Sequence, residues 1–337
     1  MKELINLQLM MFALIITGLI LKKVGVVGKE AQKGMTNLVI DLILPCNIIY
    51  SFMIKFSSKI AQDFVVILVI SILIQVFCVI LGGVLYNKCS VKRKKCLRYA
   101  TICSNAGFLG NPIAQGVFGM MGLTLASIYL IPQRIMMWSE GVSVFTEAPT
   151  KKEMLKKIFT HPCIIACEIG IVLMLTGWRP PHFLEETITS VSNCNTAMSM
   201  LVIGMILADA DPKTIIDKDV LFYTFIRLLI IPFCVFIPCW LLHIDSLVMG
   251  VSVILAAMPA GATTTILASK YDCEEEFSVK LVVFINARCF LNDERIRRLC
   301  EEIKYMEIKG LFIENSEKTC VEGMERYIID KDKCEIY

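Results

Sequence analysis

The chain has 337 residues, of which 56% are hydrophobic and 19% charged, and its formal net charge is +3. With a mean hydropathy of +0.66, a soluble domain of this size could not bury its apolar surface, so a lipid bilayer must be part of its solvent. The fifteen cysteines show neither zinc-site spacing nor the pattern of a secreted disulfide scaffold, and they are expected to act as buried hydrophobic residues. We therefore expect no metal and no cofactor.

The first apolar run extends from Leu4 to Leu21. Lys2 precedes it, as in a signal peptide, but no small-residue cleavage site follows. Instead Lys22 and Lys23 end the run, and another apolar segment begins soon after. The run is interpreted as a first membrane span.

Further apolar segments follow along the chain. A helix needs about 20 mainly apolar residues to cross about 30 Å of hydrocarbon, and lipid offers no partner to open backbone. The predicted spans are 4–22, 35–54, 64–86, 97–119, 122–145, 161–178, 187–208, 219–242, 246–269 and a tenth that begins at Phe277 and fades by Leu291. The expected fold class is an all-α polytopic membrane protein.

Basic residues are unevenly distributed among the connections. The odd-numbered connections hold Lys22, Lys23, Lys29, Lys33, Lys88, Lys92, Arg93, Lys94, Lys95, Arg98, Lys151, Lys152, Lys156, Lys157, Lys213 and Lys218. The even-numbered ones hold only Lys55, Lys59 and Arg179. By the positive-inside rule the odd connections are cytoplasmic, which predicts a multi-pass protein of the cell membrane with its N-terminus outside. The lysine clusters then need no nucleic-acid partner.

The two halves of the chain resemble each other faintly. A shift of 154 residues places Gly107 on Gly261 and Arg134 on Arg288, and it aligns the span boundaries. Because five spans are an odd number, the second copy enters the membrane from the opposite side, as in carriers with inverted repeats. The predicted organisation is a first repeat at 1–146, a cytoplasmic connection at 147–160, a second repeat at 161–291 and a charged tail at 292–337.

Two apolar segments are interrupted at matching places of the repeats. The fourth contains glycines and a proline within 104–112, and the ninth contains them within 257–265. Proline and glycine break helices, and a pair of broken helices in corresponding places indicates the binding site of a transporter. Proline kinks and small residues for close helix packing are the alternative explanation.

Half-helices that begin at the bilayer centre would present partial positive charge to an anion. On this basis the predicted substrate-binding residues are Asn105, Gly107, Gly110, Asn111, Pro112, Pro259, Ala260, Gly261, Thr263 and Thr264. The asparagines and threonines would add neutral hydrogen bonds that orient the ligand.

The interrupted segments resemble the auxin efflux carrier family. Asn105, Gly110 and Pro112 match the asparagine, glycine and crossover proline of that family's fourth helix. The run 256–261, followed by 268–271, matches its ninth helix. A Leu-Pro stretch of the second helix is matched by Leu44 and Pro45, with Asn47 just beyond. The resemblance covers about residues 1–285, and it implies ten spans, crossing fourth and ninth helices and a role for Asn47 in substrate binding.

By this resemblance the protein would move a small organic anion by alternating access. Plant members of the family transport auxin, whereas bacterial members are linked to dicarboxylates such as malate. No long hydrophilic loop separates spans five and six, which favours the compact, malate-permease-like bacterial type. The expected partners are the small anion and membrane lipids, and the sequence leaves homodimer formation open.

The end of the chain departs from the family pattern. The tenth span turns polar after Ile285, and nearly half of residues 292–337 are charged. A frameshift or gene fusion that replaced the second half of the last helix is one hypothesis, and it would make the second repeat incomplete. An apolar run of about 15 residues in another reading frame, enough to complete a span of about 20 residues, would support it.

Five ionisable residues fall inside predicted spans, where charge is costly and marks function. They are Asp41, Arg134, Glu140, Glu168 and Arg227. Asp41 is a candidate proton or cation site, and Arg134 is a candidate partner of an anionic substrate. Arg227 is expected to snorkel to the cytoplasmic side. Glu140 and Arg134 lie six residues apart, off a common helix face, so they are not expected to pair.

Three classes of function are compatible with a polytopic membrane protein. A carrier is the main interpretation, and a transport-inactive receptor or sensor with the same fold is the alternative, which the charged tail would suit. An intramembrane enzyme is not expected, because the sequence has no paired aspartates in facing spans, no His-Glu zinc motif and no Gly-x-Ser-x-Gly elbow.

Overall fold

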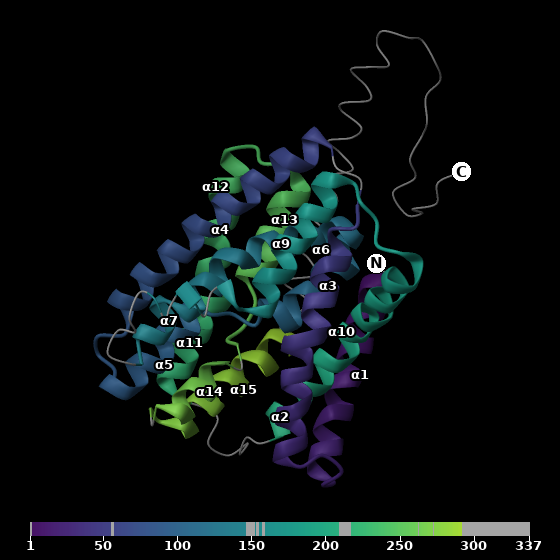
Figure 1. The fold of residues 1–337 in the computed structure, drawn as a ribbon. Coiled ribbons are helices and arrows are strands. Elements are labelled where there is room, and N and C mark those ends of the chain that lie inside the picture. Colours follow the sequence, from purple (N-terminus) through teal and green to yellow (C-terminus); the bar gives the residue numbers. More distant parts are fainter. Residues whose placement is uncertain are drawn as a thin grey trace.

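The computed structural model of the chain describes residues 2–54, 57–145, 152, 155–156, 159–208, 217–261, 263–271 and 273–291. Most of the predicted connection at 147–160 and the whole charged tail at 292–337 therefore lie outside the described residues. Within them, every regular element is helical (Figure 1). They contain one isolated β-bridge, between Ser104 and Ala260.

The helices follow the chain in the order that the apolar segments predict, and a π-helical turn joins two pieces in two places, between α2 and α3 and between α11 and α12. They are α1 (Lys2–Lys23), α2 (Lys29–Leu38), η1 (Val39–Ile43), α3 (Leu44–Ser51), α4 (Ser58–Leu85), α5 (Val91–Ile102), η2 (Ala106–Gly110), α6 (Asn111–Trp138), α7 (Glu140–Ser143), α9 (Pro162–Thr176), α10 (His182–Ala208), α11 (Lys218–Phe225), η4 (Ile226–Ile230), α12 (Ile231–Leu241), α13 (Ser246–Ala256), α14 (Thr263–Lys270) and α15 (Glu275–Leu291).

Local sequence fixes where several helices begin. The side chains of Ser57, Ser90, Asp217 and Asp245 each accept a hydrogen bond from a backbone N–H in the first turn of α4, α5, α11 and α13. Such caps satisfy amides that have no partner inside the helix. The helix boundaries are thus encoded next to the apolar runs.

The chain reverses direction inside α6. Gly119 has φ 65° and ψ −152°, a conformation open to glycine but strained for other residues. A Cβ on Gly122 would collide with the Ala114 carbonyl and the Phe118 side chain, which a continuous helix would keep further away. Residues before and after Gly119 therefore form the two arms of a helical hairpin, as expected for spans four and five.

The helices pack in two groups. One contains α1, the α2–α3 segment, α9 and α10; the other contains α4, α5, α6 and α11 to α15. Small residues allow close contact within the first group, because Gly18 of α1 lies against the Leu201 backbone and Gly204 of α10 against the Ile15 backbone. Helices α3, α9 and α10 also contact α6 or η2, which joins the groups along one face.

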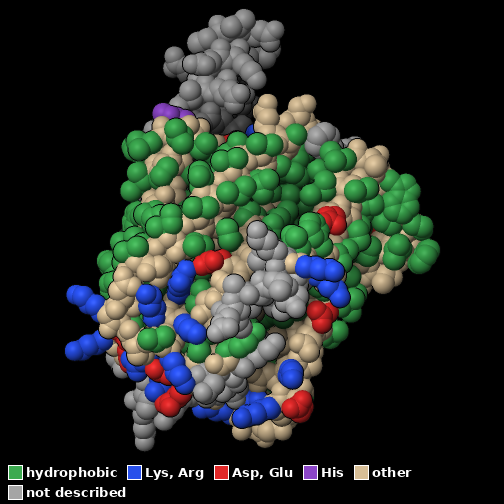
Figure 2. Space-filling model, turned by 60° about the vertical axis from the view of Figure 1, so that its left-hand side comes forward, with side chains coloured by type: hydrophobic (Ala, Val, Ile, Leu, Met, Phe, Trp, Pro, Cys, Tyr) green, Lys and Arg blue, Asp and Glu red, His purple; other side chains and the backbone are tan. Residues whose placement is uncertain are grey.

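Five of the described helical stretches are long and apolar enough to cross a membrane. By length and composition they are Lys29–Ser51, Ser58–Leu85, Ala106–Met137, His182–Ala208 and Lys218–Leu241, with shorter apolar helices at Pro162–Thr176 and Ser246–Ala256. The stretch Ala106–Met137 is divided by the bend at Gly119. Large apolar side chains stand outward, for example Val65 and Leu73 of α4. In Figure 2 hydrophobic side chains cover the upper part of the face, while Lys and Arg gather toward its lower end. The chain is a multi-pass membrane protein.

Candidate functional site

The first interruption lies between α5 and η2. Helix α5 ends at Ile102, Cys103 is extended with φ −112° and ψ 101°, and helical structure resumes at Ala106. The non-helical residues are thus 103–105, at the N-terminal edge of the predicted stretch 104–112. Asn111 and Pro112 open α6, where proline at a first turn fits a helix well.

The second interruption lies between α13 and α14. Helix α13 ends at Ala256, and α14 begins at Thr263. Pro259, Ala260 and Gly261 are non-helical, whereas Thr263 and Thr264 stand in the first turn of α14. Both interrupted segments therefore consist of two helices joined by an extended piece, and the described parts of these pieces are buried.

The two extended pieces pair with each other. The Asn105 N–H donates to the Pro259 carbonyl at 2.7 Å, and the Gly261 N–H donates to the Cys103 carbonyl at 3.3 Å. Ser104 and Ala260 form an antiparallel bridge. Because a broken helix leaves polar backbone groups without partners, this pairing satisfies groups that each interruption exposes. Residues 103–105 and 257–261 together are called the crossing below.

Amide side chains from two further helices complete the crossing. Gln133 of α6 donates from Nε2 to the Ser104 carbonyl at 2.9 Å and accepts from the Ser104 hydroxyl at 2.8 Å. Asn286 of α15 donates to the Ala260 carbonyl at 3.1 Å and accepts from the Asn105 amide at 3.0 Å. One amide thus stabilises each extended piece, and Asn286 also ties the two pieces together.

Arg227 of η4 lies beneath the crossing and is only 3% exposed. Its Nε donates to the Met258 carbonyl at 2.8 Å and its Nη1 to the Thr101 carbonyl at 2.9 Å. The Tyr223 hydroxyl, one turn earlier, donates to the Ala100 carbonyl at 2.8 Å. The prediction that Arg227 snorkels to the membrane surface is therefore wrong, because backbone carbonyls freed at the breaks give the guanidinium partners in the interior.

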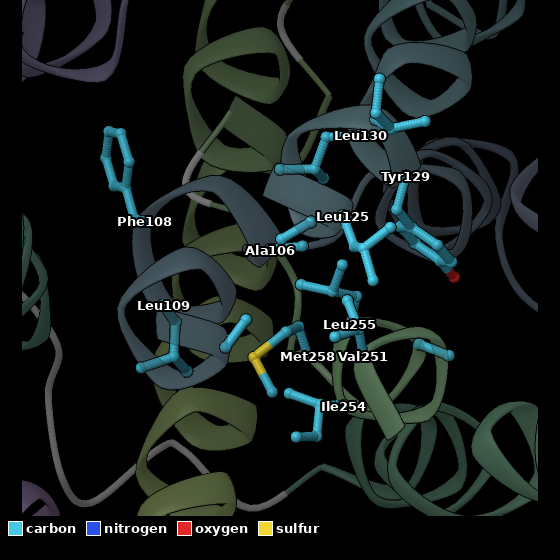
Figure 3. Packing of buried hydrophobic residues seen from close by; sticks show 14 of the residues in the cluster. Ala106, Phe108, Leu109, Leu125, Tyr129, Leu130, Val251, Ile254, Leu255 and Met258 are labelled. Atoms are coloured by element: carbon cyan, nitrogen blue, oxygen red, sulfur yellow. The ribbon is translucent and has the colours of Figure 1, made fainter. Parts of the chain in front are cut away.

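Apolar packing holds the same region. Leu255 and Met258 point toward η2 and α6 (Figure 3). Phe108 of η2 points away from Leu255 and Met258. A Cβ added to Gly110 would stand 2.6 Å from Leu255 Cδ2 and 3.1 Å from Met258 Cγ. Glycine at this position is thus favoured by the close approach of η2 to the end of α13, because a larger residue would displace Leu255 and crowd Met258.

A cavity of about 210 Å³ borders the crossing, between the two helix groups. Ser104, Asn105, Gln133, Gly261 and Thr263 form its polar wall. The opposite wall comes from the α2–α3 segment and α9. The remaining lining residues are Thr36, Ile40, Leu44, Tyr99, Gly107, Phe108, Leu130, Arg134, Met137, His161, Cys163 and Leu267.

Arg134 supplies a positive charge to this cavity. It is 7% exposed, and its Nη1 lies 3.8 Å from the Cys167 thiol. Among the described residues no carboxylate forms an ion pair with it. His161 adds no second charge in this arrangement, because its Nδ1 accepts a hydrogen bond from the Cys163 N–H and is therefore unprotonated.

Two helix N-termini reach the cavity as well. Gly107 and Phe108 stand in the first turn of η2, which Asn105 precedes, and Thr263 opens α14, with Gly261 two residues before it. The first turn of a helix carries free N–H groups and partial positive charge. An anion in the cavity would thus meet a buried arginine and the positive ends of two helices.

Other predicted binding residues lie in or near the crossing but do not line this cavity. They are Gly110, Asn111, Pro112, Pro259, Ala260 and Thr264. Asn111 and Thr264 are fully buried, and their side-chain polar atoms have no hydrogen-bond partner in the described part of the chain. Such groups are costly unless water or another molecule reaches them.

The structure places the remaining predicted residues elsewhere. Asn47 is fully buried between α3 and α10, where it donates to the Ser192 hydroxyl and accepts from Asn195, away from the cavity lining. Asp41 is exposed on η1. Glu140 accepts a 2.6 Å hydrogen bond from Arg98, a pairing that the sequence reasoning did not identify.

Sequence reasoning also missed Gln133, Tyr223 and Asn286. Each is a single polar or hydroxyl side chain in an apolar run, a signal for interior hydrogen bonding in a membrane helix. Gln133 follows Pro132 inside α6, and Asn286 stands where the tenth segment begins to turn polar. In the sequence that polar onset resembles a departure from the family, whereas in the structure it is part of the site.

The sequence model of a family described as "Membrane transport protein" matches residues 4–154 and 145–291. The chain belongs to this family. The match confirms the resemblance to auxin efflux carriers, and it continues beyond Ile285, where the sequence suggested a departure. A second family, "CRISPR-associated protein (Cas_Csn2)", matches only residues 266–333, mostly outside the described residues.

Two relatives with curated descriptions are similar along most of the chain, and a third is similar along about half of it. An uncharacterized transporter of Methanocaldococcus jannaschii is 24% identical over 82% of this chain and 91% of its own length. One of Methanothermobacter thermautotrophicus is 25% identical over 79% and 88%. The uncharacterized transporter YfdV of Escherichia coli is 21% identical over 49% and 55%.

Proposed function

We propose that the protein is a secondary carrier that moves a small organic anion across the cell membrane by alternating access. The architecture proposed for it has ten spans in two inverted five-helix repeats, with the N-terminus outside and the interrupted fourth and ninth spans crossing. The substrate proposed is a carboxylate, such as malate or an auxin-like weak acid.

The observation that carries this proposal is the position of Arg134. A buried guanidinium without a carboxylate partner in the described structure is costly in a membrane interior. In this protein it faces a cavity lined by the first turns of η2 and α14, which add positive potential. A carboxylate bound in the cavity would neutralise Arg134, and the neutral groups of Asn105, Gln133 and Thr263 would orient it.

The dimensions of the cavity support a small substrate. A volume of about 210 Å³ corresponds to about seven water molecules at about 30 Å³ each. The apolar residues Ile40, Leu44 and Leu130 among its lining would contact the carbon skeleton. Because the cavity lies between the two helix groups, a shift of one group against the other would change its access, as alternating access requires.

Uptake into proteoliposomes tests the proposal. The full chain would be reconstituted and given labelled malate, other carboxylates or indole acids, with imposed pH or sodium gradients. We expect uptake or exchange of at least one of these anions. Saturable binding without any gradient-driven uptake or exchange would contradict the carrier and favour the receptor alternative.

Substitution of Arg134 tests the site itself. Arg134→Gln should weaken binding of the transported anion by roughly 100-fold, the equivalent of one lost charge-assisted hydrogen-bonding partner. Arg98→Gln is the matched control, because Arg98 is a half-buried arginine paired with Glu140 and does not line the cavity. Equal affinities of the Arg134→Gln variant and the unmodified protein would exclude Arg134 from the site.

Asn105→Ala tests the wall formed by the crossing. We expect loss of anion binding together with a modest fall in stability, since the amide that faces the cavity also donates to Asn286. Equilibrium binding and thermal unfolding of the purified variant separate the two effects. Unchanged affinity would remove Asn105 from the substrate site.

A further inference from the structure

On the side of the crossing that faces Arg227, two helix C-termini meet, and these carry partial negative charge. Helix α5 ends at Ile102 and helix α13 at Ala256, so the last carbonyl groups of both helices meet there. The end of an α-helix is equivalent to about half a negative charge. Two such ends amount to about one negative charge, in a region where Thr101 and Met258 are fully buried.

Most carbonyls at these two ends have identified partners. Those of Tyr99 and Ala100 accept from the Cys103 N–H and the Tyr223 hydroxyl. Those of Val253 and Ile254 accept from the Ala257 N–H. The carbonyls of Thr101 and Met258 accept from Arg227. The single guanidinium therefore bridges one carbonyl from each broken segment.

The surroundings of Arg227 contain no other described charge that could balance it. The titratable groups that interact with it are the thiols of Cys78 and Cys103 and the hydroxyls of Tyr86, Tyr129 and Tyr223, all of which are buried. Among the described residues Arg227 forms no ion pair with a carboxylate, and it does not line the cavity. The positive charge is thus balanced by the two helix ends, as a bound cation would be.

Backbone carbonyls at the ends of broken helices are the ligands that carriers use for coupling cations such as Na⁺. We propose that Arg227 is a tethered cation: its guanidinium fills the cation site formed by the Thr101 and Met258 carbonyls, so that the crossing is held closed without a free metal cation. The role is a positioning one, because Arg227 acts on the backbone that shapes the cavity. The proposal about Arg227 rests on the proposed carrier function only for the transport measurement below.

This arrangement separates the two charges of the site. Arg134 remains available on the side of the helix N-termini, whereas Arg227 neutralises the C-termini. A carrier of this design needs no bound Na⁺ at the crossing for the anion site to form. Sodium in the medium should therefore affect neither the stability of the protein nor anion uptake through binding at this place.

Thermal unfolding of the purified full chain in detergent tests the proposal without any substrate. The midpoint of the unmodified protein should be the same in sodium chloride and in N-methyl-D-glucamine chloride of equal ionic strength. Arg227→Ala should lower the midpoint by on the order of 10 °C, because two buried carbonyls lose a charged donor. Millimolar guanidinium or Na⁺ should restore part of that loss.

Three companion variants separate charge from shape. Arg227→Lys keeps the charge and should stay insensitive to Na⁺, with a smaller loss of stability than Arg227→Met, which keeps bulk but no charge. Arg98→Ala removes an arginine from α5 outside the crossing and should show no restoration by guanidinium. Unfolding of Arg227→Met at the temperature of the unmodified protein would overturn the proposal, as would an Arg227→Ala variant that responds to neither cation.

The unmodified protein tests the proposal even if these variants fail to fold. Stabilisation by millimolar Na⁺ relative to N-methyl-D-glucamine would show a free cation site and overturn the proposal. In proteoliposomes, anion uptake at equal rates with either cation outside is the expected result, and uptake that requires Na⁺ bound at the crossing would contradict it. Absence of all uptake would count against the carrier function, while the unfolding measurements would still decide the role of Arg227.

Discussion

The two extended pieces of the crossing differ in how water can reach them. At the first, Ser104 and Gln133 line the cavity, so their mutual hydrogen bonds face a space that a ligand or water can enter. At the second, Ala260 and Asn286 are 0% and 2% exposed and do not line the cavity. The Ser104–Gln133 pair thus borders the cavity, whereas the Ala260–Asn286 pair is shielded from it, although Gly261 of the second piece also lines the cavity.

This difference indicates that the two pieces have different roles. A polar group whose hydrogen-bond partner can be replaced by water rearranges at a small cost in free energy. A buried polar group loses a full hydrogen bond when its partner leaves. We expect the first piece to adjust to the substrate and the second to hold the geometry of the crossing. Substitutions of corresponding residues should therefore affect stability unequally.

Within this comparison of the two pieces, the largest effect is expected at Asn286. Asn286→Ala removes the donor to the Ala260 carbonyl and the acceptor of the Asn105 amide, which should lower the free energy of unfolding by about 2–3 kcal/mol. Gln133→Ala is the matched variant in the other repeat and should cost only about 1 kcal/mol, because water in the cavity can solvate Ser104. If denaturant unfolding of the two purified variants shows equal losses of unfolding free energy, the proposed difference between the cavity-lining pair and the shielded pair is wrong.

An intermediate effect is expected at Gly110, where the first broken segment touches the second. The added methyl group of Gly110→Ala would collide with Leu255 and crowd Met258, and overpacking of this kind costs about 1–3 kcal/mol. Thermal unfolding measures the loss. Because Leu255→Ala makes room for the methyl group, the loss caused by Gly110→Ala should be smaller in a Leu255→Ala background than in the unmodified chain. An equal loss in both backgrounds would contradict the steric explanation.

The smallest effects are expected at the glycines that align between the repeats. Gly261→Ala brings a methyl group to 3.2 Å from the Ser104 carbonyl oxygen, whereas Gly107→Ala meets nothing nearer than Leu44 Cδ1 at 3.9 Å. The first should cost about 1 kcal/mol, and the second should be within about 0.5 kcal/mol of neutral. A larger loss at Gly107 than at Gly261 in unfolding measurements would reverse the comparison.

Much of the helical order could be predicted from the sequence, because apolar runs of span length and the caps beside them are local signals. The chain positions of the two interruptions were also predictable from their glycines and prolines. The exact residues of the interruptions could not be predicted. The first interruption begins at Cys103, and Pro112 lies in the first turn of α6, where it does not break the helix. The predicted ten-span topology and repeat inversion remain proposals.

The partners of the crossing were the least predictable part. Arg227 had a plausible local explanation as a snorkelling residue, and only the arrival of the α5 and α13 ends around it shows otherwise. Asn47 matched a family motif, yet its surroundings are Ser192 and Asn195 of α10. In both cases the partner lies more than a hundred residues away or in another broken segment, beyond the range of any periodic pattern.

The sequence by itself determined that this is a membrane protein, which segments are helical and where two of them are interrupted. Hydropathy, helix capping and the backbone preferences of glycine and proline act over a few residues, so these features can be recognised locally. Tertiary structure alone decided which freed carbonyl meets which side chain. It placed Arg134 at the helix N-termini beside the cavity and Arg227 at the helix C-termini. Two arginines of the same chemistry thus stand in opposite surroundings, and opposite roles are proposed for them, since the sign of the potential around each depends on which helix ends converge there.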